Sequence, residues 1–105
     1  MSRGGKVGIV GGMIKTFADK ATAAVFANER VRGFPPGVFQ AARRKLEVLD
    51  KAGQIEDLRA PPGNRLEKLS GNREGQWSIR INNQWRVCFR FTEGNAYDVA
   101  IVDYH

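Results

Sequence analysis

The sequence predicts a small α+β domain in which two helices pack against one face of a twisted, largely antiparallel sheet. Apolar residues recur at helical spacing within residues 20–51, whereas they alternate with polar residues within residues 77–91. The chain has 105 residues, of which 42% are hydrophobic. This length supports one hydrophobic core but not two, so both halves belong to a single domain.

The first half of the chain predicts a short strand followed by two helices. Residues 13–17 have the pattern of a short strand. Asp19 is a suitable N-cap for a helix over residues 20–31, which the glycine- and proline-rich residues 33–37 end. A second helix is expected over residues 38–51. Its buried stripe consists of Phe39, Ala42, Leu46 and Leu49.

The second half predicts four short strands after a loop over residues 55–64, where prolines and glycine gather. The strands are expected near residues 66–69 and over residues 77–81, 85–91 and 96–102. Asn82 and Asn83 suit the hairpin turn between the second and third of these strands, because asparagine tolerates a positive φ.

Alternation assigns the side chains of the central hairpin to two faces of the sheet. The apolar face, which packs against the helices, contains Trp77, Ile79, Ile81, Trp85, Val87, Phe89 and Phe91. The opposite face contains Ser78, Arg80, Arg86, Cys88 and Arg90. Both tryptophans are therefore expected in the core rather than as platforms on which bases stack.

The arginines of the second face allow two interpretations. Open sheets carry charged residues on their solvated face without any further function. Alternatively, Arg80, Arg86 and Arg90 form a phosphate cradle, because guanidinium groups bind phosphate through two parallel hydrogen bonds. Arg73, in the turn before the hairpin, and Lys68 would add to this RNA-binding surface.

Asp103, Tyr104 and His105 place an acid, a phenol and the single histidine of the chain directly after the last strand. The end of a strand holds such groups at fixed positions, where they can transfer protons. Together with the arginines they would cleave RNA without a metal, by attack of the ribose 2′-hydroxyl on the adjacent phosphate. On these residues alone, simple nucleic-acid binding ranks ahead of cleavage.

Composition indicates the compartment and the kind of partner. The formal charge is +6, or +4 without Arg3 and Lys6, which favours polyanionic partners such as nucleic acid. Cys88 is the single cysteine, so an intrachain disulfide is excluded and a reducing cytoplasm is expected. The sequence contains neither a metal-ligand cluster nor the roughly 20 apolar residues that cross a membrane, and we expect no cofactor. We expect residues 1–12 to be a flexible extension or tag remnant and residues 13–105 to form the domain.

Five blocks of sequence carry a family resemblance. They are MIKTF at residues 13–17, LEKLSGNREGQWSI at residues 66–79, NQWRVCFRF at residues 83–91, GNAY at residues 94–97 and DYH at residues 103–105. In these blocks the chain resembles the HigB (plasmid maintenance killer) branch of the RelE/ParE toxin superfamily. The resemblance covers about residues 13–105.

This resemblance implies a RelE-like fold and the toxin of a type II toxin–antitoxin pair. HigB toxins are ribosome-dependent mRNA endonucleases that cut in the A site and stop translation. By position, Arg86 matches the strand arginine implicated in catalysis, and Asp103, Tyr104 and His105 match the terminal active-site residues. Arg73 matches a basic position of the turn. The implied partners are a HigA-like helix-turn-helix antitoxin, the ribosome and mRNA, with operator DNA contacted only through the antitoxin.

The chain also departs from this family pattern at two positions. Ser70 stands where several relatives have lysine, and Glu67 stands where they have histidine. Loss of a cation weakens stabilisation of the transition state, and a nearby acid repels phosphate. Two alternatives therefore remain beside the nuclease: a ParE-like inhibitor of DNA gyrase, which needs no terminal Asp-Tyr-His, and a nuclease-inactive binding module.

Overall fold

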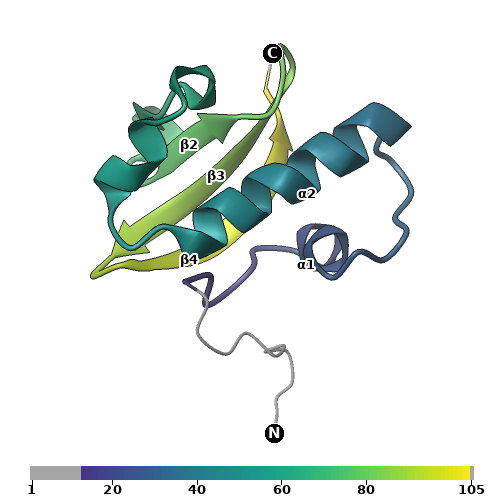
Figure 1. The fold of residues 1–105 in the computed structure, drawn as a ribbon, viewed down its shortest axis with the longest axis horizontal. Helices are drawn as coiled ribbons and strands as arrows, with labels where there is room; N and C mark the ends of the chain where they lie inside the picture. The colour runs from purple at the N-terminus through teal and green to yellow at the C-terminus, as the bar shows by residue number, and fades with distance from the viewer. Residues whose placement is uncertain (1–12, 105) are drawn as a thin grey trace, which may run out of the picture.

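The computed structural model describes residues 13–104, which form two helices packed on one side of a four-stranded antiparallel sheet of order β1-β2-β3-β4 (Figure 1). The α+β class predicted from the sequence is therefore confirmed. The main elements are α1 (Lys20–Phe26), α2 (Pro36–Lys51), β1 (Glu67–Lys68), β2 (Trp77–Arg80), β3 (Trp85–Thr92) and β4 (Asn95–Asp103). Three short 3-10 helices connect them: η2 (Ile55–Arg59), η3 (Pro62–Asn64) and η4 (Gly71–Arg73).

Helix α1 begins where the sequence predicts and ends earlier. The Asp19 side chain accepts a hydrogen bond from the Thr22 backbone N–H at 2.7 Å, which caps the helix. The predicted extension to residue 31 is wrong, because Asn28 adopts φ 64° and a left-handed residue ends a helix. Thr22 is fully buried, and its hydroxyl accepts from the Ile101 backbone N–H at 3.0 Å, so α1 is fixed to β4.

Helix α2 begins at Pro36, two residues before the predicted start, because proline is already shaped for the first helical position. Its buried residues are Val38, Ala42, Leu46 and Leu49. Phe39, predicted in this stripe, is only partly buried at the edge of the core. Within the described chain no helix is both long enough and apolar enough to cross a membrane.

The core lies between these helices and the apolar face of the sheet. Its fully buried members include Val25, Leu46, Leu49, Ile79, Val87 and Phe89. Trp77 and Trp85 are partly buried against this cluster, as predicted for core residues. Burying apolar side chains contributes roughly 25 cal/mol per Å² of surface removed from water, so this layer holds the sheet to the helices.

Residues 13–17 do not form a regular strand. They make two isolated parallel bridges to β4, Ile14 with Ala96 and Phe17 with Val99. Between these bridges β4 has an irregularity: Asp98 adopts φ 54°, and the pairing with β3 shifts by one residue between Cys88 and Arg90. The Asp98 backbone N–H donates to the Thr16 hydroxyl at 2.8 Å. The bulge at Asp98 thus interrupts the parallel ladder that a regular strand over residues 13–17 would make with β4.

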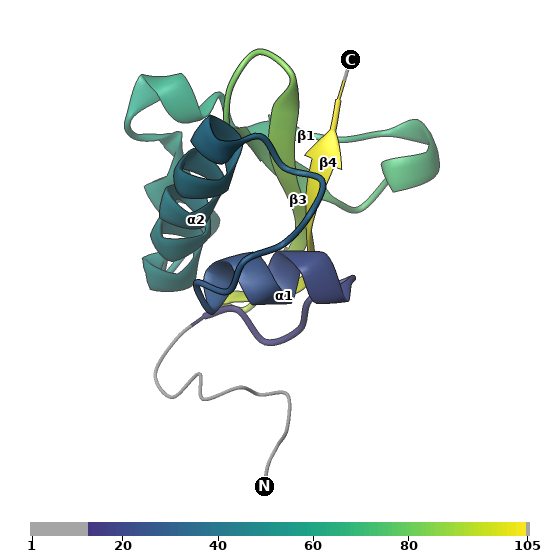
Figure 2. The ribbon, with the colours of Figure 1, turned by 90° about the vertical axis from the view of Figure 1, so that its right-hand side faces the viewer.

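The second face of the sheet is not the open, solvated face that alternation predicts. Ser78 and Cys88 are fully buried there, and Arg86 is only 8% exposed. Figure 2 shows why: α1 and α2 lie on one side of the sheet, and the segment that carries η4 lies on the other. β1 likewise holds only Glu67 and Lys68 of the four residues expected. This partial second layer lies on the same face of the sheet as Arg86.

Candidate active site

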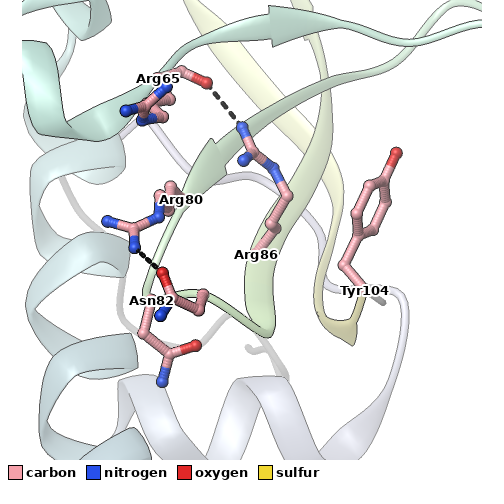
Figure 3. Close-up of a pocket in the computed structure, with 6 residues that line it drawn as sticks. Arg65, Arg80, Asn82, Arg86 and Tyr104 are labelled. Atoms are coloured by element: carbon pink, nitrogen blue, oxygen red, sulfur yellow. Dashed lines mark hydrogen bonds between the residues drawn. The ribbon is translucent and has the colours of Figure 1, made fainter.

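A cavity of about 320 Å³ lies at the end of the sheet where the β2–β3 turn meets the end of β4 (Figure 3). It is lined by Arg65, Arg80, Asn82, Asn83, Arg86 and Tyr104. Arg80 ends β2, Arg86 follows the start of β3, and the two residues pair across the strands. Residues paired in this way place their side chains on the same face of the sheet, so both guanidinium groups reach one cavity.

The turn that shapes this cavity is closed by side chains. The Asn82 side-chain oxygen accepts from the backbone N–H groups of Gln84 and Trp85, both at 2.8 Å. The Asn83 side-chain oxygen accepts from the Arg80 guanidinium. Neither asparagine adopts the positive φ expected from the sequence. The expected hairpin therefore forms, but asparagine contributes through hydrogen bonds rather than through its backbone freedom.

Arg86 is held firmly by neutral acceptors. Its Nε donates to the fully buried Ser78 hydroxyl at 2.7 Å, and its Nη2 donates to the Arg65 carbonyl at 2.6 Å. Arg65 presents this carbonyl from a left-handed backbone conformation, with φ 45° and ψ 58°. The nearest carboxylate, on Glu67, lies 3.9 Å from Nη2. The guanidinium is thus fixed in place by neutral acceptors, and its ion pair with Glu67 is long.

Tyr104 enters the site from the chain end. Its backbone N–H donates to the Gln84 carbonyl at 2.6 Å, which places the residue beside the hairpin turn. Its ring centroid lies 5.8 Å from Cζ of Arg86, a cation–π distance. In Figure 3, Arg86 stands between Arg65 and Tyr104. Tyr104 is 38% exposed, so a bound molecule can reach this residue.

Asp103, the tail residue before Tyr104, does not line this cavity. Asp103 pairs with Trp85 and therefore lies on the helix-facing side of the sheet, and its carboxylate accepts from Gln84 Nε2 at 3.1 Å. His105 lies outside the described residues, so the structure does not place its side chain. Of the two predicted catalytic tail residues that the structure describes, Asp103 and Tyr104, the tyrosine lines the cavity.

The four predicted RNA-binding residues are dispersed, and Arg80 alone among them lines the cavity. Lys68 stacks on Trp77, with Nζ 5.6 Å from the ring centroid, on the helix-facing side. Arg73 donates to the Gln76 side chain at 3.2 Å. Arg90, further along β3, pairs with Asp98 at 3.4 Å. Sequence alternation places Arg86 and Arg90 on one face but does not predict that their side chains have different partners.

Sequence reasoning missed Arg65, Asn82 and Asn83 as site residues. The asparagines were expected only as turn formers. Arg65 follows a loop rich in proline and glycine, where no periodicity assigns a side chain to a face. Its proximity to Arg86 arises from a contact between residues 21 positions apart. The sequence around Arg65, which directly follows η3, contains no pattern that predicts this contact.

The charges around the cavity are mostly positive. Within residues 13–104, Arg65 and Arg80 form no ion pair with a carboxylate. On α2, burial lowers the pKa of Lys45, and the positive charges of Arg44 and Arg80 lower it further. The described residues contain no group of three or more His, Cys, Asp or Glu side chains arranged to hold a metal ion. The arrangement suits an anion.

Comparisons with known proteins agree with this architecture. A family described as the RelE-like toxin of the type II toxin–antitoxin system HigB matches residues 15–105. Toxin HigB-1 of Vibrio cholerae is 44% identical over 90 residues, which cover 85% of this chain and 95% of that protein. Endoribonuclease HigB of Proteus vulgaris is 34% identical over 93 residues, which cover 89% and 100%.

A solved structure supports the fold independently. The YoeB–YefM complex from Staphylococcus aureus contains a chain that superposes with a TM-score of 0.55 at 21% identity, covering 88% of this chain and 94% of that one. The family match and the two relatives establish more than the fold, and they confirm the resemblance inferred from the sequence. The chain belongs to the HigB family of RelE-like toxins from type II toxin–antitoxin systems.

Proposed function

We propose that this toxin is a ribosome-dependent mRNA endonuclease and that the cavity holds the phosphate at the bond it cuts. The observation that carries this proposal is the state of Arg86, which is 8% exposed and bonded to two neutral acceptors. A buried, oriented guanidinium whose nearest carboxylate is 3.9 Å away, on the exposed Glu67, is suited to charge that develops on a phosphate. The name of the Proteus vulgaris relative, an endoribonuclease, supports the same activity.

The proposed reaction needs no water molecule in its first step. The ribose 2′-hydroxyl attacks the adjacent phosphorus, a base removes the hydroxyl proton, and the bond from phosphorus to the 5′-oxygen breaks as an acid protonates that oxygen. The products are a 2′,3′-cyclic phosphate and a 5′-hydroxyl. Arg86 stabilises the negative charge on the phosphate oxygens, while Arg65 and Arg80 hold the RNA backbone.

The proton-transfer groups are assigned to the chain end. Tyr104, which lies beside Arg86, touches the substrate and exchanges a proton or stacks on a base. His105 is the second proton-transfer group by family resemblance. Asp103 faces the other side of the sheet, so we propose that it positions the chain end through Gln84 rather than contacts RNA. Lys68, Arg73 and Arg90 remain proposed RNA contacts outside the cavity.

The ribosome enters the proposal because the protein offers little for independent RNA binding. Affinity for a nucleic acid grows with the number of phosphates contacted, and the cavity has three arginines. A ribosome with mRNA in its A site supplies the missing orientation, and such proximity can lower a barrier by several kcal/mol. We further propose a cytoplasmic location, a HigA-like helix-turn-helix antitoxin, and contact with operator DNA only through that antitoxin.

The test compares cleavage of one transcript with and without ribosomes at matched salt. We expect clear cleavage on ribosomes with an open A site and little on naked RNA. The 5′ fragment should end in a 2′,3′-cyclic phosphate. Equal rates with and without ribosomes would show a free ribonuclease, and a plain 3′-hydroxyl end would exclude attack by the 2′-hydroxyl.

A nuclease-inactive binding module is the second candidate, and one observation favours it. The Glu67 carboxylate, 3.9 Å from Arg86, competes with a phosphate for the same guanidinium. Inducible expression of the chain separates the candidates. Growth arrest with loss of mRNA supports the nuclease, arrest with DNA-damage signals supports the gyrase-inhibitor alternative, and unchanged growth supports the inactive module.

A further inference from the structure

We infer that Asn64, together with Lys45, is a positioning device for Arg86. It fixes the loop whose next residue, Arg65, offers the carbonyl that orients the guanidinium. The inference rests on the proposed function of the cavity, and it assigns a role to two residues that do not line it. Asn64 is here a positioning residue, since it acts on Arg86 only through the carbonyl of the next residue, Arg65.

Asn64 is a polar residue built into the interior. Its side chain is fully buried, and its Nδ2 donates to the carbonyls of Leu58 at 3.2 Å and Ala60 at 3.1 Å. Its Oδ1 accepts from Lys45 Nζ. Every polar atom of this amide is therefore bonded. A buried polar group that satisfies all its partners imposes one geometry on the segments it joins.

Lys45 connects this amide to a helix that packs on the core. It lies on α2 next to Leu46, which is fully buried in the core. Burial lowers the pKa of the Lys45 amine, as do the neighbouring charges of Arg44 and Arg80. The amine thus remains in an unfavourable electrostatic environment, and its hydrogen-bond partner there is the neutral Asn64 amide. The contact ties the loop to the helix rather than neutralising a charge.

The conformation of this loop sets the position of the Arg65 carbonyl, which contacts Arg86. The backbone N–H groups of Asn64 and Arg65 donate to the carbonyls of Pro61 and Pro62, at 2.9 and 3.1 Å. Arg65 is consequently held in the left-handed region, which a residue with a side chain rarely adopts. In this conformation its carbonyl meets Arg86 Nη2 at 2.6 Å. Releasing Asn64 would free the loop to move that carbonyl.

Two substitutions test the contributions of Asn64 and Lys45 separately. Asn64→Asp keeps an acceptor for Lys45 but loses both amide donors, and Lys45→Met keeps the helix and the aliphatic stem but loses the donor to Asn64. Val25→Ala serves as the control, because it removes fully buried volume from α1 without touching the loop or the cavity. Thermal unfolding of all three variants measures how much each is destabilised.

The direct readout is the ¹⁵N NMR signal of the Arg86 Nε–H group, identified by its loss in Arg86→Lys. We expect this signal to shift or broaden in Asn64→Asp and Lys45→Met and to stay in place in Val25→Ala. Single-turnover cleavage on ribosomes should fall by about 10- to 100-fold in Asn64→Asp, the range typical of a misplaced catalytic group, and by less in Lys45→Met.

Each outcome has a separate meaning. An unchanged Arg86 signal in a folded Asn64→Asp or Lys45→Met variant would overturn the inference and show that the network only stabilises the loop. If Asn64→Asp does not fold, Lys45→Met decides the question by the same signal. A wild-type chain without nuclease activity would contradict the proposed function, while the NMR comparison would still test the coupling of Asn64 to Arg86.

Discussion

Arg86 and Arg90 lie four residues apart on one face of β3, yet they differ in burial and in how closely a carboxylate approaches them. The Arg86 side chain is 10% exposed and donates to a neutral hydroxyl and a neutral carbonyl, while the Glu67 carboxylate lies 3.9 Å from Nη2. Arg90 has a side chain that is 47% exposed and pairs with Asp98 at 3.4 Å. Arg90 also lies so close to Gly75 that a Cβ there would be 2.7 Å from Nη1.

The difference shows which cation is available to a substrate. A guanidinium that already faces a carboxylate gains little from a phosphate, since the pair must first be separated. A guanidinium fixed by neutral groups keeps its charge for a newly arriving anion. Alternation along a strand assigns the two arginines to the same surface, and their partners give them different roles.

Arg86→Ala tests the largest consequence of this contrast. We expect cleavage on ribosomes to fall by about 10²-fold or more, because charge on the phosphate loses its stabilising donor. Arg90→Ala is the matched comparison: as a proposed RNA contact outside the cavity, Arg90 should affect KM, and kcat should stay within about threefold of wild type. Arg86→Lys should recover part of the loss, as a lysine cannot reproduce the two parallel donors. Equal losses in both alanine variants would remove the distinction.

Cys88, between the two arginines, reports how far the buried part of the face extends. Burial raises the pKa of its thiol, and the charges of Arg73 and Arg86 oppose this only in part. Labelling with a thiol reagent near neutral pH should be about 100-fold or more slower than in the urea-unfolded chain, because it requires local opening. Fast labelling of the native chain would mean that the face around Arg86 is open.

Arg65 and Arg80 should behave as binding residues beside Arg86. Replacing the Arg80 side chain with alanine should raise KM by about tenfold and change kcat little, as expected where ground state and transition state are bound alike. Arg65→Gly is the matched variant for the loop, since glycine keeps the left-handed backbone and its carbonyl contact. A drop in kcat as large as that of Arg86→Ala would contradict this division.

Glu67→Gln should increase the difference between Arg86 and Arg90, because Arg86 would lose its carboxylate partner while Arg90 keeps Asp98. Removing the carboxylate 3.9 Å from Nη2 leaves the guanidinium free of its nearest competitor. We expect kcat/KM to rise by roughly two- to fivefold, a modest change because the Glu67 side chain is 55% exposed and solvent screens it. The check is a steady-state comparison at two salt concentrations, and a lower kcat/KM would give Glu67 a supporting role.

Asp98→Asn should have the smallest effect. Asparagine accepts the left-handed conformation at this position, so the substitution removes the ion pair with Arg90 and preserves the bulge. An exposed pair of this kind contributes about 0–1 kcal/mol, and chemical denaturation should show no larger loss. Asp98→Val, which tolerates positive φ poorly, provides the contrast. A loss above this range in Asp98→Asn would assign Arg90 a structural role.

The parts of the fold that the sequence predicts are those set by local periodicity. The alternation of residues 77–91 placed Ile79, Val87 and Phe89 in the core, where the structure has them. The burial of Ser78 and Cys88 was missed, because the cover comes from a segment that has no periodicity of its own. The residues that line the cavity divide in the same way. Arg86, Arg80 and Tyr104 could be predicted from their strand positions, whereas Arg65 reaches the cavity through a long-range loop contact.

The bulge at Asp98 decides which tail residue meets the cavity. Near the turn, Arg90 pairs with Tyr97, and a regular ladder from there would set Gln84 opposite Asp103. The extra residue advances the register by one, so Trp85 stands opposite Asp103 instead. Side chains alternate across a strand, so this shift by one sends the carboxylate to the helix side and Tyr104 to the side of Arg86. One extra residue, whose backbone N–H donates to the Thr16 hydroxyl, thus decides which tail side chain lies beside Arg86: if Asp98 paired in the ladder instead of forming the bulge, Asp103 rather than Tyr104 would lie beside the guanidinium.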